Sequence, residues 1–377
     1  MGHPPKGDNQ QRMSTLFSIW HRIQHTLFPW MEEVLDPLTE KQREFVRVIE
    51  LADIQRHICP YRWQGIGRKR EDRLAMVLAF VAKAVYNIPT TKALIAFLRD
   101  GKNLRRLCGW ESQGDIPSES TFSRAFEEFS RDGLGEKIHA AMVMQHAGPK
   151  LAGHVSRDST AIEAREKPLR KAPKTLKVKL KRKRGRPRRG ESRVEKEPKR
   201  LDFQPGRSLE ENLADLPKGC DVGTKVNAKG YKTSWIGYKL HLDSIDGDIP
   251  VSAILSSASL HDSQAAIPLA QKTAGRIVNL YDLMDSAYDA PQIKAFSTTL
   301  GHVPIIDANP RRGEKQEMDP DRAERFKNRS TAERVNANLK DNYGGRFVRV
   351  RGAAKVMTHL MFGLIAITAT QLFRLLE

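Results

Sequence analysis

The segment HVSRDSTAI, residues 154–162, marks a change in the character of the chain. Valine, threonine and isoleucine recur along it, and β-branched residues of this kind favour strands. Four further runs of strand-forming residues follow, at residues 233–245, 250–257, 276–284 and 302–307. Between these runs, residues 262–272 and 291–300 have the composition of helices. Three strands, a helix, a strand, a helix, a strand and a final helix predict an α/β fold with a mixed sheet flanked by helices.

The chain before this segment is predicted to be helical. Residues 71–87, EDRLAMVLAFVAKAVYN, are rich in good helix formers. Asn87-Ile88-Pro89 ends this helix before a second one at residues 91–100. The predicted units are a polar and then aromatic N-terminal segment at residues 1–45, a helical domain at 46–148 and an α/β domain at 149–377.

A third helix is predicted within DIPSESTFSRAFEEFSRDG, residues 115–133. Its apolar positions recur at helical spacing, at Phe122, Ala125, Phe126 and Phe129. In a helix-turn-helix, its polar face would turn four side chains toward DNA: Ser120, Thr121, Ser123 and Arg124. An ordinary amphipathic helix with a polar cap explains the pattern equally well, so both interpretations stay open.

Length and composition set limits on the class of protein. A chain of 377 residues can bury a sizeable core and hold two or three structural units. The three cysteines lack the spacing of a zinc site or a disulfide framework, which fits a reducing, cytoplasmic setting. The apolar stretch at residues 356–376 is interrupted by polar side chains, so we expect a packed core helix and no membrane contact.

Most of the net charge of +19 lies in one segment. Residues 165–200 contain 18 lysines or arginines and four glutamates. Such a block repels itself, is extended and attracts a polyanion, most plausibly nucleic acid, although a solvated linker is the alternative. It falls between the first and second predicted strands, and we expect an insertion at about residues 166–229 that is largely disordered without a partner.

The insertion contains KRKRGRPRRG, residues 181–190. Its Arg184-Gly185-Arg186-Pro187 core resembles an AT-hook, in which Arg184 and Arg186 would enter a narrow minor groove. Generic attraction to phosphates is the alternative for so short a motif.

Three separated acidic residues are candidates for a metal site. Asp158 lies in the first predicted strand, Asp285 just after the fourth, and Glu333 in FKNRSTAERVNANLK, residues 326–340. On a helix, Arg329 and Lys340 share the face of Glu333. Converging carboxylates repel one another unless a cation lies between them. Two Mg²⁺ ions about 4 Å apart, held by such oxygens, would support phosphoryl transfer.

Each acid also has a simpler explanation. Asp158 could be a turn residue at a strand end, and Asp282 or Asp289 compete with Asp285 as the relevant acid. Glu333 could complete a capping box with Ser330.

The spaced motif carries a family resemblance. The chain resembles bacterial insertion-sequence transposases of the DDE class, whose RNase H-like catalytic domain has the signature Tyr, two residues, Arg, three residues, Glu, six residues, Lys. Phe326, Arg329, Glu333 and Lys340 stand at these intervals. The segments around Asp158 and Asp285 are similar to the family's first and second acidic motifs, and residues 50–145 are similar to its helical domain.

The resemblance implies a function and the parts that perform it. We expect a DNA transposase in which Asp158, Asp285 and Glu333 bind two Mg²⁺, for which Mn²⁺ can substitute. Arg329 and Lys340 would contact phosphates, while Phe326, which lacks the family's tyrosine hydroxyl, keeps a ring for base stacking. The partners implied are element ends and target DNA, bound by a homodimer or higher multimer near the bacterial nucleoid. A DNA nuclease without joining activity and an inactive DNA-binding relic are the alternatives.

Overall fold

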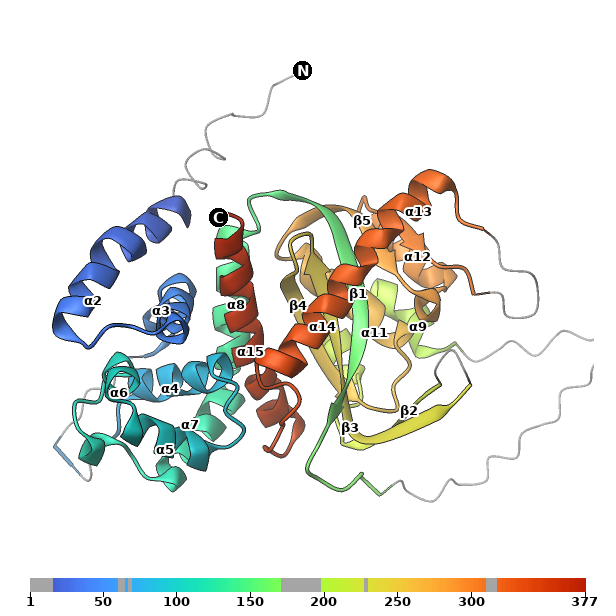
Figure 1. Cartoon of the computed structure of the whole chain (residues 1–377). Helices are drawn as coiled ribbons and strands as arrows, with labels where there is room; N and C mark the ends of the chain where they lie inside the picture. Colours follow the sequence, from blue (N-terminus) through green and yellow to red (C-terminus); the bar gives the residue numbers. More distant parts are fainter. Residues whose placement is uncertain (1–15, 60–64, 67–69, 171–197, 227–229, 310–316) are drawn as a thin grey trace, which may run out of the picture.

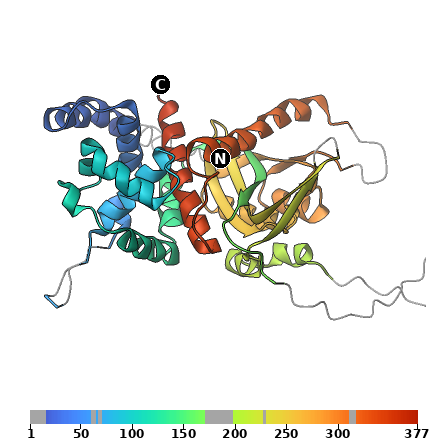
Figure 2. The same ribbon diagram turned by 60° about the horizontal axis from the view of Figure 1, so that its bottom comes forward.

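The computed structural model describes residues 16–59, 65–66, 70–170, 198–226, 230–309 and 317–377. Figure 1 shows a group of helices on one side and a β-sheet with its covering helices on the other. Helix α15, Ala353–Arg374, runs between them. The view in Figure 2, turned by 60°, shows the same separation, so α15 lies between the two parts in both views.

The N-terminal part is helical, as the sequence predicts. Its α-helices are α2 (Phe28–Val34), α3 (Glu40–Ala52), α4 (Arg73–Val85), α5 (Thr91–Asp100), α6 (Lys102–Leu107), α7 (Glu119–Arg131) and α8 (Leu134–His146). Shorter helical turns are η1 (Ile23–Leu27), η2 (Ile54–His57) and η3 (Gln113–Asp115). Side-chain caps fix three of the starts, because Thr39, Asp72 and Thr90 accept hydrogen bonds from the first turns of α3, α4 and α5.

The second part is built on one six-stranded sheet. Its strands are β1 (Leu151–Glu163), β2 (Asp221–Val226), β3 (Lys232–Ile245), β4 (Ile249–Ser257), β5 (Val278–Met284) and β6 (Val303–Ile306). The order is β2-β3-β1-β5-β6, with β4 also paired to β3. Strand β1 is antiparallel to β3 and parallel to β5, so the sheet is mixed and the predicted α/β fold is confirmed.

Helices cover both faces of this sheet. They are α11 (Ser263–Ala274), α12 (Pro291–Thr299), α13 (Pro320–Phe326) and α14 (Ser330–Asn342), with the turns η5 (Ser286–Tyr288) and η6 (Lys327–Arg329). Successive side chains of a strand point to opposite faces. On β1, Asp158 contacts Asn336 of α14, whereas Arg157 pairs with Asp243, which also bonds Thr273 of α11. Helices α14 and α11 therefore lie on opposite faces.

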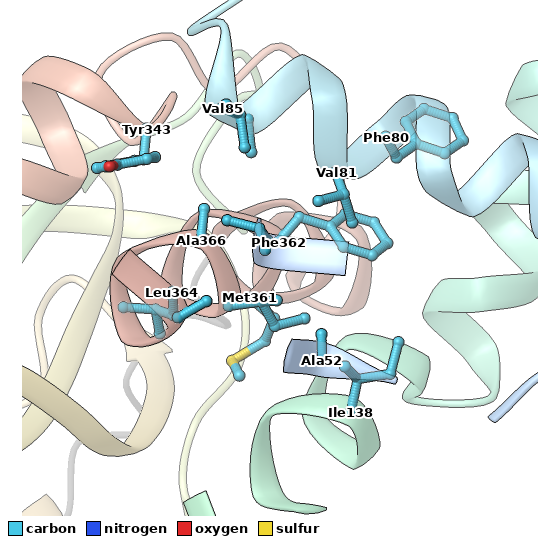
Figure 3. Packing of buried hydrophobic residues seen from close by; sticks show 14 of the residues in the cluster. Ala52, Phe80, Val81, Val85, Ile138, Tyr343, Met361, Phe362, Leu364 and Ala366 are labelled. Atoms are coloured by element: carbon cyan, nitrogen blue, oxygen red, sulfur yellow. The ribbon is translucent and has the colours of Figure 1, made fainter. Parts of the chain in front are cut away.

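Helix α15 joins the two parts through one hydrophobic core. It packs against α3, α4, α7 and α8 and also against β4. Figure 3 shows Met361, Phe362 and Leu364 of α15 among side chains of the neighbouring helices. In the described part of the chain this helix alone is long and apolar enough to cross a membrane, and 83% of its apolar window is buried in the protein. It is a core helix, as expected.

Polar contacts reinforce the same joint. Glu136 of α8 forms ion pairs with Arg276 and, at 2.8 Å, with Lys272 of α11. His139, one turn further along α8, lies 3.1 Å through Nε2 from both the Pro250 carbonyl and the Thr368 hydroxyl. The helical part is thus attached to β4, α11 and α15 at once.

The predicted insertion is in part folded, which corrects the expectation of disorder from residue 166 to 229. Residues 198–226 form α9 (Arg200–Phe203), η4 (Gln204–Gly206), α10 (Leu209–Asp215) and β2. The buried amide of Asn212 bonds the Gln204 carbonyl at 3.0 Å and Gln271 of α11 at 2.9 Å, which attaches these helices to the sheet domain. Residues 171–197, with most of the basic block, lie outside the described residues.

A buried ion pair lies beneath the end of the central strands. Arg157 is bidentate to Asp243, with Nε and Nη2 at 2.8 and 2.7 Å from its two carboxylate oxygens. Both side chains are fully buried, and Nη1 of Arg157 lies 3.5 Å from Sδ of Met284. The pair thereby connects β1, β3 and β5 directly behind Asp158 and Asp285.

We expect Arg157→Met to lower the free energy of unfolding by about 3–5 kcal/mol, because it leaves Asp243 as an uncompensated buried charge. Arg334→Met is the control: it removes a bidentate pair with Asp248, but Arg334 is half exposed and the loss should be about 1 kcal/mol or less. Urea unfolding followed by circular dichroism measures both. Equal losses in the two variants would contradict the role given to the buried pair.

Candidate active site

Two of the predicted acids come together where the parallel pairing of β1 with β5 ends. Arg157 of β1 is in register with Met284 of β5. The next position after each of these residues is an aspartate, so Asp158, within β1, and Asp285, just after β5, lie side by side. Asp285 also caps the turn η5 by accepting a 2.9 Å hydrogen bond from the backbone of Ala287. Both carboxylates are only partly buried.

The surroundings of the two acids disfavour their negative charge. Burial, and then the neighbouring Asp285, raise the pKa of Asp158 to about 6, against the favourable charges of Arg329 and Lys225. Burial is also the main cause of the raised pKa of Asp285, and Asp262 adds to it. A site that resists negative charge in this way is one that a cation stabilises.

Glu333 lies on α14, which crosses the same face of the sheet. One turn after it, Nδ2 of Asn336 donates a 3.2 Å hydrogen bond to Asp158. Glu333 is therefore on the side of α14 near Asp158. Its own carboxylate points elsewhere, however: its side chain is 55% exposed and Oε1 is 2.5 Å from Nη2 of Arg329. Arg329 thus pairs with Glu333 while its charge acts on both aspartates.

The segment from Phe326 to Lys340 is less regular than the single helix that the spacing predicts. Helix α13 ends at Phe326, η6 covers Lys327–Arg329, and α14 begins at Ser330. The Ser330 hydroxyl bonds the carbonyl of Lys327 at 3.0 Å and α14 has no side-chain cap, so the capping box proposed for Glu333 is not formed. The pairing of Arg329 with Glu333 survives this change of helix type.

The residues present fit a divalent cation in part. No three histidine, cysteine or acidic side chains within the described ranges already converge on one point. Asp158 and Asp285 nonetheless supply adjacent hard oxygen ligands. Beside them, the buried Tyr288 hydroxyl and the buried Oδ1 of Asn336 have no hydrogen-bond partner in the described structure. Unpaired buried groups next to two acids suit the water shell that Mg²⁺ retains.

The competing acids are engaged elsewhere. Asp282 is buried and accepts hydrogen bonds from Asn279 at 3.1 Å and from Ser297, with Nδ1 of His302 at 3.2 Å. Asp289 pairs with Lys294 at 2.7 Å. Asp285, in contrast, is one of the causes of the raised pKa of Asp158.

Two charged residues at the site were missed by the sequence analysis. Lys225, in the unpredicted strand β2, favours the ionised forms of both Asp158 and Asp285. Asp262 follows β4 and pairs with Lys239 at 2.9 Å. Burial acts to raise the pKa of Asp262, but Lys239, His241 and Ser159 together outweigh burial and the pKa is lowered. Only the position of Asp262 at the start of the predicted helix 262–272 could have indicated it.

The remaining signature residues flank the acids. The ring of Phe326 is half buried and lies 5.7 Å from the Arg329 guanidinium, so the ring supports that arginine. Burial, with Arg346 and Lys225 nearby, lowers the pKa of Lys340.

The predicted DNA-binding elements are described in part. Helix α7 forms as expected and buries Phe122, Ala125, Phe126 and Phe129. Arg124 is exposed and donates a 3.2 Å hydrogen bond to Thr121, which fits either interpretation of this helix. Arg184 and Arg186 lie outside the described residues.

We expect Asp158→Asn to raise the free energy of unfolding at pH 7 by about 1–2 kcal/mol in the presence of EDTA. The folded pKa of Asp158 is about 6 and the unfolded value is near 3.8, so the wild type loses stability as pH rises through that interval. The amide has no charge to lose. Urea midpoints at pH 4 and pH 7 measure the effect, which should vanish at pH 4. An unchanged or lower midpoint of the variant at pH 7 would show that ionised Asp158 does not destabilise the folded protein.

Two family models match the chain. The model "Transposase domain (DUF772)" matches residues 31–128, which hold α3 to most of α7. The model "Transposase DDE domain" matches residues 208–369 and includes Asp285 and Glu333, while Asp158 precedes its first residue. No curated protein matches the chain. The two models together span most of the sequence, and their order agrees with the helical part followed by the mixed sheet. The chain belongs to the DDE transposases of insertion sequences.

Proposed function

We propose that the chain cuts DNA at the ends of its element and joins the freed 3′ end to target DNA. The observation that carries this proposal is the meeting of Asp158 and Asp285 beneath α14, the helix of Glu333. The family implies DNA binding and polynucleotidyl transfer, normally with divalent metals. Cleavage and joining are then the same displacement at phosphorus, performed first with water and then with a 3′-hydroxyl.

Asp158, Asp285 and Glu333 are the residues proposed to hold Mg²⁺, or Mn²⁺ in its place. When bound, two such ions activate the attacking oxygen and stabilise the leaving one. The two aspartates are already adjacent, and Glu333 would join them by turning away from Arg329. A cation between the acids would offset the burial and the repulsion from Asp285 that raise the pKa of Asp158, so it would favour this rearrangement.

Arg329 has a second task in this arrangement. Once Glu333 turns toward the aspartates, the guanidinium loses its partner and is free to bind a DNA phosphate. Phe326 holds the guanidinium from one side. Lys340 and Lys225 add positive charge along the path of the DNA strand. The hydroxyl absent from Phe326 is not needed for this support.

The rest of the chain would hold the DNA. We propose that α7, with Arg124, and the basic block, with Arg184 and Arg186, bind DNA outside the active site. Because joining requires two element ends in one complex, we further propose that at least two copies act together on DNA. The basic block also speeds association through long-range attraction, an effect that salt weakens.

We expect Glu333→Gln to reduce Mg²⁺-dependent nicking of a supercoiled plasmid carrying the gene's flanking DNA by about 10³-fold or more. Glutamine keeps the size of the side chain but removes the negative charge that binds the metal. Binding of the same DNA should persist. Glu324→Gln is the matched control, since Glu324 is an exposed glutamate of α13 paired with Lys327. The control should cut as the wild type does.

A second assay separates the alternatives. A labelled, pre-cut end with a 3′-hydroxyl should be joined to plasmid DNA by the wild type and not by Glu333→Gln. Cutting without joining would identify a nuclease. Equal cutting by wild type and Glu333→Gln would reject the assignment of Glu333, and DNA binding with no cutting by either would identify an inactive relic.

A further inference from the structure

A basic groove of about 590 Å³ lies away from the three acids. It is bounded by α4, the start of α5, the first half of α7, the chain just after β1 and the chain entering α15. Six basic side chains line it: Lys83, Lys92, Arg165, Arg349, Arg351 and Lys355. The lining contains one carboxylate, Glu119. Its excess of positive charge suits a polyanion.

Lys83 is the unusual member of this set. It lies on the core side of α4 and only 8% of it is exposed. No hydrogen bond or ion pair to its ammonium group is found in the described structure, and burial lowers its pKa to about 8 without help from any neighbouring acid. Buried lysines are normally paired, because an isolated buried charge is costly. The groove is the direction in which a partner can reach it.

The base of the groove is apolar and firmly packed. Phe80 stacks on Phe362 with ring centres 6.1 Å apart, and Phe126 closes the cluster at 4.9 Å from Phe80. Figure 3 shows Phe80 and Phe362 facing each other between α4 and α15. His359 beside them is buried, donates from Nε2 to the Gly344 carbonyl at 2.9 Å, and has a pKa lowered to about 3 by burial and Lys83. It adds no charge at neutral pH.

The rim offers polar groups that bind oxyanions. Thr90 and Thr91, at the N-terminus of the ten-residue helix α5, line the groove. The start of a helix carries partial positive charge and favours anions. Some rim groups are already engaged: Lys355 is 3.3 Å from Glu127, and Nε of Arg351 donates to the Arg165 carbonyl at 3.0 Å. A bound anion would therefore change the environment of Lys83 more than that of these engaged groups.

We propose that this groove binds the phosphate backbone of DNA, with Lys83 as its innermost contact. The proposal takes DNA as the ligand from the proposed function, but it does not depend on catalysis. Arg165 lies seven residues beyond Asp158, roughly 20 Å along the chain that continues β1. One turn of duplex DNA is about 34 Å long, so a single duplex can reach both places. The groove would then fix the DNA relative to the acids.

The test is DNA binding in EDTA, measured by fluorescence anisotropy of a labelled duplex between 50 and about 300 mM salt. We expect Lys83→Met to weaken binding about five- to tenfold near 100 mM salt and to reduce the slope of log K against log salt by about one, the value for one lost phosphate contact. The control is Lys137→Met, an exposed lysine of α8 outside the groove lining. It should change neither quantity. Lys92→Met, on the rim, repeats the test should Lys83→Met fail to fold.

A pH titration gives a second readout. The groups facing Lys83 across the groove are Lys92 of α5, Glu119 of α7, Arg165, Arg349 and Arg351 of the adjoining chain, and Lys355 and His359 of α15. Binding favours the charged lysine, whose pKa of about 8 lies below that of an ordinary lysine. Wild-type affinity should therefore fall as pH rises from 8 to 9.5, by up to tenfold per unit, and this fall should be smaller in Lys83→Met.

Three outcomes would overturn the proposal. Equal salt slopes for wild type, Lys83→Met and Lys92→Met would show that DNA does not enter the groove. Equal losses in Lys83→Met and Lys137→Met would reduce the effect to net charge. Calorimetric binding of inorganic phosphate that Lys83→Met abolishes, with DNA affinity unchanged, would assign the groove to a small phosphate ligand. Because cleavage is assayed separately with Glu333→Gln, each proposal can fail without the other.

Discussion

The burial of helix α15 is the constraint on which the rest of the structure depends. Its apolar surface extends around most of its circumference, so helices must cover one side and the sheet the other. The helical part packs on it through α3, α4 and α8, and β4 packs on it from the sheet. This shared core fixes the groove at Lys83 relative to the acids at the sheet edge. The proposed DNA-binding groove and the candidate active site are thereby joined by one core.

Electrostatic balance organises the reaction centre in a similar way. The register of β1 and β5 places Asp158 and Asp285 together, so the two aspartates cannot move apart unless these strands separate. Arg329 and Lys225 offset part of the resulting repulsion, and Arg329 also neutralises Glu333. Arg329 is therefore the counter-ion of the acidic residues in this structure. In the proposed function, metal binding would replace that counter-ion, which would link the position of Glu333 to the charge of the two aspartates.

The sequence predicted the parts of this fold that have strong local signals. Five strands, α11, α12 and the helices α4, α5 and α7 follow from apolar periodicity and composition, and their ends agree within a few residues. Strand β2 was missed because DVGTKV has few apolar residues and takes its stability from pairing with β3. The aspartates could be proposed from their positions next to strands. The engagement of Glu333 with Arg329 could not, since the same spacing suits a metal ligand and an ion pair. Lys83 gave no signal, because burial of a helical lysine is decided by distant neighbours.

The shared core also determines when the protein can become functional during its synthesis. Helix α3 begins at Glu40 and packs on α15, which begins at Ala353. The ribosome must therefore synthesise about 300 residues after α3 before its packing partner exists. Contacts so far apart in sequence form late and slowly. Until α15 leaves the ribosome, α4, α8 and β4 expose apolar faces that favour aggregation and proteolysis. A polypeptide interrupted before this helix is therefore expected to be removed by cellular proteases, and incomplete copies would not accumulate as competitors for the DNA that the whole protein binds.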